Sequence, residues 1–217
     1  SPYPLKVFNH REGEIMEMDL EEYLIGVVAG EMPAAFHLEA LRSQAIVART
    51  YTIQKIEAQK GEDKHPGSDI CTDHTHCQAW ISSAAAQENW GENAAEYMEK
   101  ITTAVKSTAG LVVTHEDELI EAVYHSTCGG QTAAAHHIWS GSAPYLVTQQ
   151  CTYCSHSPWY STKKQIPFDT FRQAFSKGGT LPVMTGEGNP RIEVVEASSI
   201  GRAKTISIGG EVYTALD

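Results

Sequence analysis

One carboxyl group of the chain stands in an unusual setting. Glu31 follows an apolar run at residues 27–29 and Gly30, and it precedes Met32 and Pro33, which reverse the chain. A carboxyl group at a helix end among apolar residues is partly desolvated and can hold a proton near neutral pH, as a general acid must. On these residues alone a simpler interpretation stays open, in which Glu31 only solvates a helix end as one of 27 acidic residues.

Metal-ligating side chains are concentrated in residues 65–77. His65, Cys71, His76 and Cys77 form a Cys2His2 set of the kind that structural zinc prefers, and His74 could replace His76. Four protein ligands would make the ion a structural clip, because a catalytic zinc keeps an open position. The spacing leaves two alternatives open: a disulfide between Cys71 and Cys77, and a loop of solvated histidines.

A third stretch has the composition of a sugar-binding loop. Its glycines let the backbone approach a ligand closely, and its hydroxyl and amide side chains can hydrogen-bond sugar hydroxyls and acetamides. The residues concerned are Tyr124, His125, Ser126, Thr127, Gly129, Gly130, Gln131 and Thr132. We expect a strand end that lines a substrate groove, with an ordinary hairpin end as the alternative.

A Cys-x-x-Cys pair, Cys151 and Cys154, lies farther along the chain. Thioredoxin-like chemistry would require a strand before it and a helix after it, and neither pattern is present. A disulfide, a metal pair with His156 or with His136 and His137, and two plain thiols all stay open. Because the chain has five cysteines, at least one of them has no disulfide partner within the same chain.

The composition is that of a globular domain. The chain has 217 residues, 41% of them hydrophobic, and 27 acidic against 16 basic residues give a net charge of −11. This length and apolar content suffice for one core, and the acidic balance argues against nucleic acid as a partner. The printed residues contain no signal peptide and no apolar run near the roughly 18 residues of a membrane span. An anchor outside these residues stays open.

The periodicity predicts helices over residues 20–30, 37–59 and 92–108, the first capped by Asp19. Alternating segments predict hairpins over 5–18 and 111–124 and a β-meander over 191–215. We therefore expect an α+β fold in which two main helices and a third pack against β-hairpins, with a small C-terminal β-meander. Residues 1–217 would form a single catalytic domain with a Cys/His-rich insertion at about 61–90, which we expect to be loop.

One basic side chain needs a partner. Arg49 lies on an apolar stripe near the middle of the long second helix. A guanidinium in that position requires a carboxylate or a ligand.

Residues 20–51, 124–132 and 139–146 together resemble the stage II sporulation protein D family. The segments Gly30-Glu31-Met32-Pro33 and Ala48-Arg49-Thr50-Tyr51 carry the resemblance most specifically. It implies a peptidoglycan lytic transglycosylase of endospore-forming bacteria that acts during engulfment of the forespore. In that family the glutamate that matches Glu31 is the catalytic acid, the arginine that matches Arg49 is functional, and some members bind zinc in the Cys/His segment.

The implied mechanism needs a single carboxyl group. Glu31 would protonate the glycosidic oxygen between N-acetylmuramic acid and N-acetylglucosamine, and would then accept the proton of the sugar's 6-hydroxyl, which forms a 1,6-anhydro end. Arg49 would hold the lactyl carboxylate of muramic acid or orient Glu31. Because that substrate is anionic, we expect local positive charge near Arg42 and Arg49.

The resemblance also implies a location and partners. The full-length protein would be membrane-anchored and extracytoplasmic, at the engulfing membrane of the mother cell. It would act on peptidoglycan glycan strands with sister sporulation proteins that include a membrane protein and an amidase that removes stem peptides. Two rival functions stay open: a zinc-dependent peptidoglycan amidase that uses the Cys/His segment, and a non-catalytic glycan-binding module.

Overall fold

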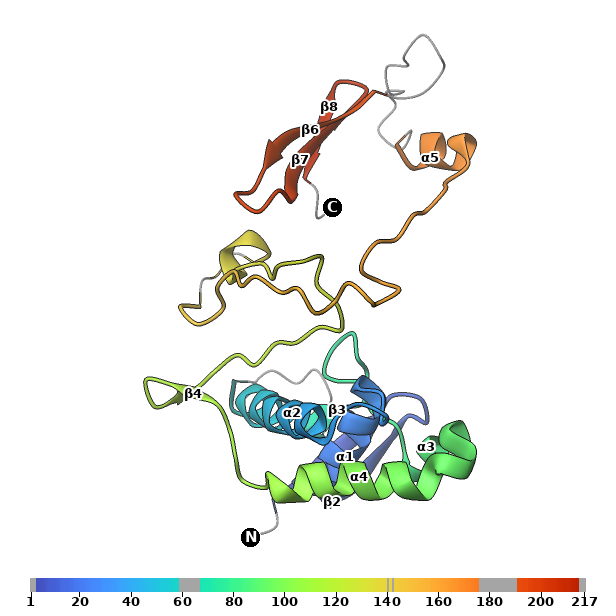
Figure 1. Cartoon of the computed structure of the whole chain (residues 1–217), viewed down its shortest axis with the longest axis vertical. Coiled ribbons are helices and arrows are strands. Elements are labelled where there is room, and N and C mark those ends of the chain that lie inside the picture. Colours follow the sequence, from blue (N-terminus) through green and yellow to red (C-terminus); the bar gives the residue numbers. More distant parts are fainter. Residues whose placement is uncertain (1–2, 59–66, 140, 142, 176–190, 215–217) are drawn as a thin grey trace. The chain divides into compact units, whose positions relative to one another are not determined.

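The chain forms two compact units, Ser1–Tyr124 and His125–Asp217 (Figure 1). The computed structural model describes residues 3–58, 67–139, 141, 143–175 and 191–214. The prediction of one catalytic domain over residues 1–217 stays a prediction. Within the described ranges, no helix combines the length and the apolar character that crossing a membrane requires.

A small sheet opens the first unit. Strands β1 (Pro4–Asn9) and β2 (Glu14–Asp19) pair antiparallel, and β3 (Ile70–Cys71) adds parallel to β1, so the order is β2-β1-β3. Leu5 and Val7 are buried, Pro4 and Lys6 are exposed and Phe8 is partly buried, which follows the alternation expected of a half-buried strand. The predicted first hairpin is confirmed.

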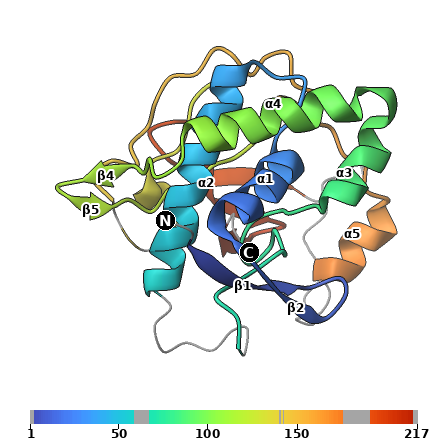
Figure 2. The ribbon, with the colours of Figure 1, turned by 90° about the horizontal axis from the view of Figure 1, so that it is seen from below.

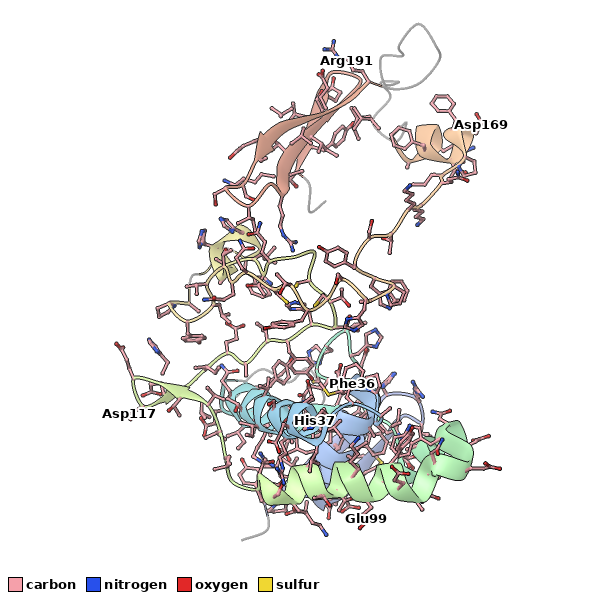
Figure 3. The ribbon with its side chains drawn as sticks, in the orientation of Figure 1. Phe36, His37, Glu99, Asp117, Asp169 and Arg191 are labelled. Atoms are coloured by element: carbon pink, nitrogen blue, oxygen red, sulfur yellow. The ribbon has the colours of Figure 1, made fainter. Side chains whose placement is uncertain are left out.

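The core of the first unit is built around α1 (Leu20–Glu31). Figure 2 shows α1 between the β1–β2 hairpin and α4 (Ala94–Ser107), with α2 (Leu38–Ala58) beside it. Asp19 caps α1 as predicted, because its carboxylate accepts the backbone N–H of Glu21 at 3.0 Å. His37 opens α2 (Figure 3), and its Nδ1 accepts the backbone N–H of Glu39 at 3.3 Å. The three predicted helices are confirmed to within a few residues of their ends.

Two predictions about the first unit need correction. Part of the expected loop at 61–90 is helical, as α3 (Ser83–Trp90), followed by the short 3-10 turn η1 (Gly91–Asn93). The Ser82 hydroxyl caps α3 by accepting the N–H of Ala85 at 3.1 Å, and the run of alanines that follows favours a helix. Residues 59–66, which include the start of the expected insertion, lie outside the described residues.

The second correction concerns the hairpin predicted over 111–124. Only β4 (Thr114–His115) and β5 (Glu118–Leu119) pair, around a turn with Asp117 at its tip (Figure 3). Beyond these strands the Ile120 N–H still donates to the Val113 carbonyl at 3.3 Å, but the Val113 N–H donates to Thr50 and the Leu111 carbonyl accepts from Arg49. Side chains of α2 therefore take the backbone groups that a longer ladder would use.

The second unit contains the 3-10 turn η2 (Ala135–His137), α5 (Phe168–Phe175) and a three-stranded sheet. Strands β6 (Ile192–Ala197), β7 (Ala203–Ile208) and β8 (Glu211–Thr214) are antiparallel neighbours, which confirms the predicted meander. Residues 124–132 form no regular strand; an isolated bridge joins Gln131 to Gln150. The α+β class is confirmed.

Candidate active site

Glu31 is the last residue of α1, and one of its two carboxylate oxygens is held in place. Its Oε1 accepts the backbone N–H of Ala79 at 2.7 Å and the hydroxyl of Tyr124 at 3.3 Å. Both donors belong to the first unit. Among the described residues, no hydrogen bond engages Oε2. The half-buried carboxyl group is thus oriented through one oxygen and can offer the other to a ligand.

A glycine face on α1 brings Ala79 to Glu31. Gly26 and Gly30 lie one turn apart, and a Cβ added at Gly30 would sit 3.1 Å from the carbonyl carbon of Ala79. A Cβ at Gly26 would sit 2.1 Å from Nε1 of Trp80. The Ile81 N–H also donates to the Gly26 carbonyl at 3.2 Å. Residues 79–81 therefore pack directly on the helix backbone. The spacing Gly26-x-x-x-Gly30 was the only signal of this contact in the sequence.

Tyr124, the predicted sugar-binding residue that belongs to the first unit, lies beside Glu31. Its hydroxyl also lies 3.0 Å from Oε1 of Gln78, a side chain that is 1% exposed and donates through Nε2 to Thr52. Burial, and after it the negative charge of Glu31, raise the pKa of Tyr124. The phenol therefore stays protonated, and its single proton serves either Glu31 or Gln78.

Arg49 is engaged by the protein itself. Its guanidinium is 1% exposed and forms a two-pronged pair with Glu21, with Nε–Oε1 at 2.8 Å and Nη2–Oε2 at 2.6 Å. The remaining N–H groups donate to the carbonyls of Leu111, Val105 and Ala45 at 3.1, 3.3 and 3.5 Å. All five donors of the guanidinium are thus used.

The structure does not bring Arg49 to Glu31. Glu21, the partner of Arg49, lies in the first turn of α1, and Glu31 ends the same helix about 15 Å farther along its axis. Neither predicted role of Arg49, orienting Glu31 or holding a substrate carboxylate, is reflected in these contacts. Its participation in the reaction stays a prediction.

The expected positive charge around Arg42 is also compensated. Arg42 pairs with Glu39 one turn earlier on α2 and donates from Nε to the Ser107 hydroxyl at 3.0 Å. Both basic side chains are therefore already paired with acidic residues of the first unit.

Three of the predicted metal ligands converge in the first unit. The sulfurs of Cys71 and Cys77 lie 3.6 and 3.4 Å from Nδ1 of His76, and all three ligand atoms fall within 4.8 Å of one another. Tetrahedral zinc with ordinary bond lengths separates a sulfur from a nitrogen ligand by about 3.6 Å. We call these residues the Cys–His triad. Its donors and spacings fit zinc.

The remaining histidines of the segment do not add a described ligand. The fourth predicted ligand, His65, lies outside the described residues. His74, the predicted substitute for His76, is 74% exposed and faces Asp73 instead. A hydrogen bond with the Cys71 side chain and, as the second cause, burial raise the pKa of Cys77. A cation would therefore be needed to hold both sulfurs as thiolates.

The other predicted substrate-binding residues belong to the second unit. Several of their side chains have protein partners there: the hydroxyls of Thr127 and Ser157 lie 2.7 Å apart, Thr132 accepts from the Gln149 N–H at 2.9 Å, and Gln131 donates to the Ile200 carbonyl at 3.1 Å. A groove shared by Glu31 with His125, Ser126, Thr127, Gly129, Gly130, Gln131 and Thr132 stays a prediction.

Comparisons with known proteins agree with the motifs. A family model described as stage II sporulation protein matches residues 9–115. The chain is 35% identical over 216 residues to stage II sporulation protein D of Bacillus subtilis (strain 168), covering all of the chain and 58% of that protein. It is 34% identical over 173 residues to the protein of that name from Bacillus amyloliquefaciens, covering 80% of the chain and 50% of that protein.

A more distant relative carries a different name. The chain is 34% identical over 147 residues to the amidase enhancer of Bacillus subtilis (strain 168), covering 68% of the chain and 18% of that protein. The chain spans about half the length of the two sporulation proteins it matches. The matched residues 9–115 contain Glu31, its donor Ala79 and the Cys–His triad. The chain belongs to the stage II sporulation protein D family.

Proposed function

We propose that this chain is a peptidoglycan lytic transglycosylase of sporulation, with Glu31 as its only acid and base. The observation that carries the proposal is the setting of Glu31, in which Oε1 is held by two donors while Oε2 has no described partner. Among the described residues, no second carboxyl group is hydrogen-bonded to Glu31. This arrangement supports a reaction that uses one carboxyl group, whereas glycoside hydrolases ordinarily use two.

The reaction begins with Glu31 protonated. Oε2 donates its proton to the glycosidic oxygen as the bond from C1 of N-acetylmuramic acid to that oxygen breaks, and the N-acetylglucosamine end leaves as an alcohol. The resulting carboxylate then takes the proton of the 6-hydroxyl of the muramic acid as that oxygen bonds to C1. The products are a free sugar hydroxyl and a 1,6-anhydro ring. Glu31 returns to its acid form, and no water is consumed.

Ala79 and Tyr124 would stabilise the charge that appears on Glu31 midway. The Ala79 N–H already donates to Oε1 and the Tyr124 oxygen lies within hydrogen-bonding distance of it, so only the Tyr124 proton has to turn when the carboxylate forms. The Tyr124 proton can serve Gln78 while Glu31 is neutral and Glu31 while it is charged. The Tyr124 hydroxyl would thus respond to the protonation state of the acid, whereas the Ala79 N–H would stay on Oε1 throughout.

The Cys–His triad would hold a structural zinc ion with no role in the chemical steps. Bound there, zinc would cross-link β3 to the chain at Cys77, two residues before Ala79. Triad and general acid would therefore be linked mechanically, through the short segment that packs on α1.

The biological setting is proposed from the relatives. The names of the two sporulation proteins support a role in sporulation. For that role we propose that the full-length protein is membrane-anchored and cleaves glycan strands outside the cytoplasmic membrane during engulfment. The relative named amidase enhancer supports a link to a cell-wall amidase, which would supply strands without stem peptides. We also expect a membrane protein among the partners.

The test uses purified glycan strands stripped of peptides, with products identified by mass spectrometry. Wild-type protein should release anhydro products, lighter than hydrolytic ones by one water, and Glu31→Gln should release none. Glu39→Gln is the matched control, since it removes an acid from the exposed Arg42 pair, and it should keep the activity. Hydrolytic products from the wild type would refute the mechanism. Strand binding without products would favour the glycan-binding module. In a parallel assay on intact peptidoglycan, release of stem peptides would favour the amidase.

A further inference from the structure

Three cysteines of the second unit point their sulfurs at one another. Cys128, Cys151 and Cys154 bring their sulfur atoms within 4.8 Å of one another, and those of Cys151 and Cys154 are 3.8 Å apart. A disulfide would require about 2.05 Å, whereas two thiolates on one tetrahedral zinc ion are about 3.8 Å apart. The observed spacing fits two ligands of one zinc ion.

Backbone hydrogen bonds, independent of the sulfurs, bring the two segments together. The N–H of Cys151 donates to the Gly130 carbonyl at 2.9 Å, and the N–H of Thr132 donates to the Gln149 carbonyl at 2.8 Å. The bridge between Gln131 and Gln150 lies between these contacts. The cysteines therefore meet because the backbone has already aligned the two loops, as a preorganised site requires.

The loops also supply donors to the sulfurs. A backbone N–H two residues after the cysteine faces the sulfur in both loops, from Gly130 to Cys128 and from Tyr153 to Cys151. Gly130 has a φ of +104° in this turn, a backbone conformation that residues with a side chain rarely adopt. Hydrogen bonds of this kind orient metal-bound ligands and stabilise their charge.

We infer that Cys128, Cys151 and Cys154 bind a zinc ion through three thiolates. Thiolates select soft or borderline ions, and zinc requires no redox partner. Cys128 is buried and the other two are partly buried, so the site is shielded yet accessible to an entering ion. Such an ion would tie residues 128–131 to 150–154 and fix the loop that carries Gln131. The inference concerns the second unit and does not depend on the proposed reaction.

Elemental analysis of the purified chain, prepared under reducing conditions, tests this site apart from the Cys–His triad. In the variant Cys71→Ser/Cys77→Ser we expect one zinc ion per chain to remain. Adding Cys151→Ser and Cys154→Ser should remove it, while adding Ser155→Ala, an exposed neighbour, should not. Circular dichroism verifies that each variant is folded. A folded Cys71→Ser/Cys77→Ser variant without zinc would overturn the inference, and so would zinc that survives the loss of Cys151 and Cys154.

Alkylation of the wild-type chain provides a readout that requires no variant. The alkylating reagent is iodoacetamide, and peptide mass spectrometry measures its reaction with Cys151 and Cys154. Bound zinc should protect both until a chelator is added, with no reductant needed. Reaction at once, before chelation, would show two plain thiols, and reaction only after a reductant would show a disulfide. Either of these results would overturn the inference.

Discussion

Arg49→Met should destabilise the first unit by about 3 kcal/mol. Removing one member of a buried ion pair costs about 3–5 kcal/mol, because the partner is left charged and uncompensated. Arg49 is 1% exposed, but the Glu21 side chain keeps 26% exposure, so water can solvate the remaining carboxylate and the cost falls at the lower end. In a chain of this size, about 3 kcal/mol lowers the melting temperature by about 10 °C.

Thermal unfolding followed by circular dichroism measures this effect. Glu21→Leu/Arg49→Met should recover most of the lost stability, because no buried charge is left. Arg42→Met is the control: it breaks a more exposed pair and should cost less than about 1 kcal/mol.

The same variants separate a structural role of Arg49 from a catalytic one. If the contacts of Arg49 describe its role, the folded fraction of Glu21→Leu/Arg49→Met should cleave glycan strands near the wild-type rate. A variant that melts like the wild type yet releases no product would refute this reasoning, and would place Arg49 on the substrate instead.

Three further perturbations test the setting of Glu31. Gly30→Ala should change stability by less than about 1 kcal/mol, because alanine favours a helix. It should nevertheless slow glycan cleavage about tenfold, because the added Cβ displaces the Ala79 N–H. An unchanged rate would contradict the packing argument. Tyr124→Phe removes a hydrogen-bond donor to the Glu31 carboxylate, so turnover should fall about tenfold while strand binding is retained. Equal turnover of variant and wild type would show that Tyr124 does not stabilise the charge on Glu31. Stripping zinc from the Cys–His triad should lower both melting temperature and turnover, and adding zinc should restore them. If neither the melting temperature nor the turnover changes, the hypothesis of a structural zinc ion at the Cys–His triad is refuted.

Local patterns predicted the elements of the fold well. The apolar spacing of the first two helices, the capping carboxylate of Asp19 and the alternation around Leu5 and Val7 are each fixed by neighbours in sequence. The shortened hairpin at Thr114–Leu119 shows the limit, because its flanking backbone bonds to α2 side chains more than 60 residues away. No local pattern contains that competition.

The candidate site depends on more distant pairings. The isolated charge of Arg49 indicated that a carboxylate or a ligand was needed, but only the fold selects Glu21 among 27 acidic residues. Likewise the motif around Glu31 predicted an acid, whereas its donor Ala79 lies 48 residues away and carries no side-chain signal. A backbone donor can occur at any non-proline residue, so sequence alone could not have identified it.

The position of Ala79 changes what a chelation experiment can decide. Because Cys77 and Ala79 are two residues apart, losing an ion from the Cys–His triad would loosen the donor that orients Glu31. Activity would then depend on zinc even though zinc touches no reacting atom, and a zinc amidase would show the same dependence. Only the products separate the two cases. A Cys77→Ser variant with slow cleavage but anhydro ends still has Glu31 as its acid, whereas released stem peptides that depend on zinc would make the triad the reacting centre.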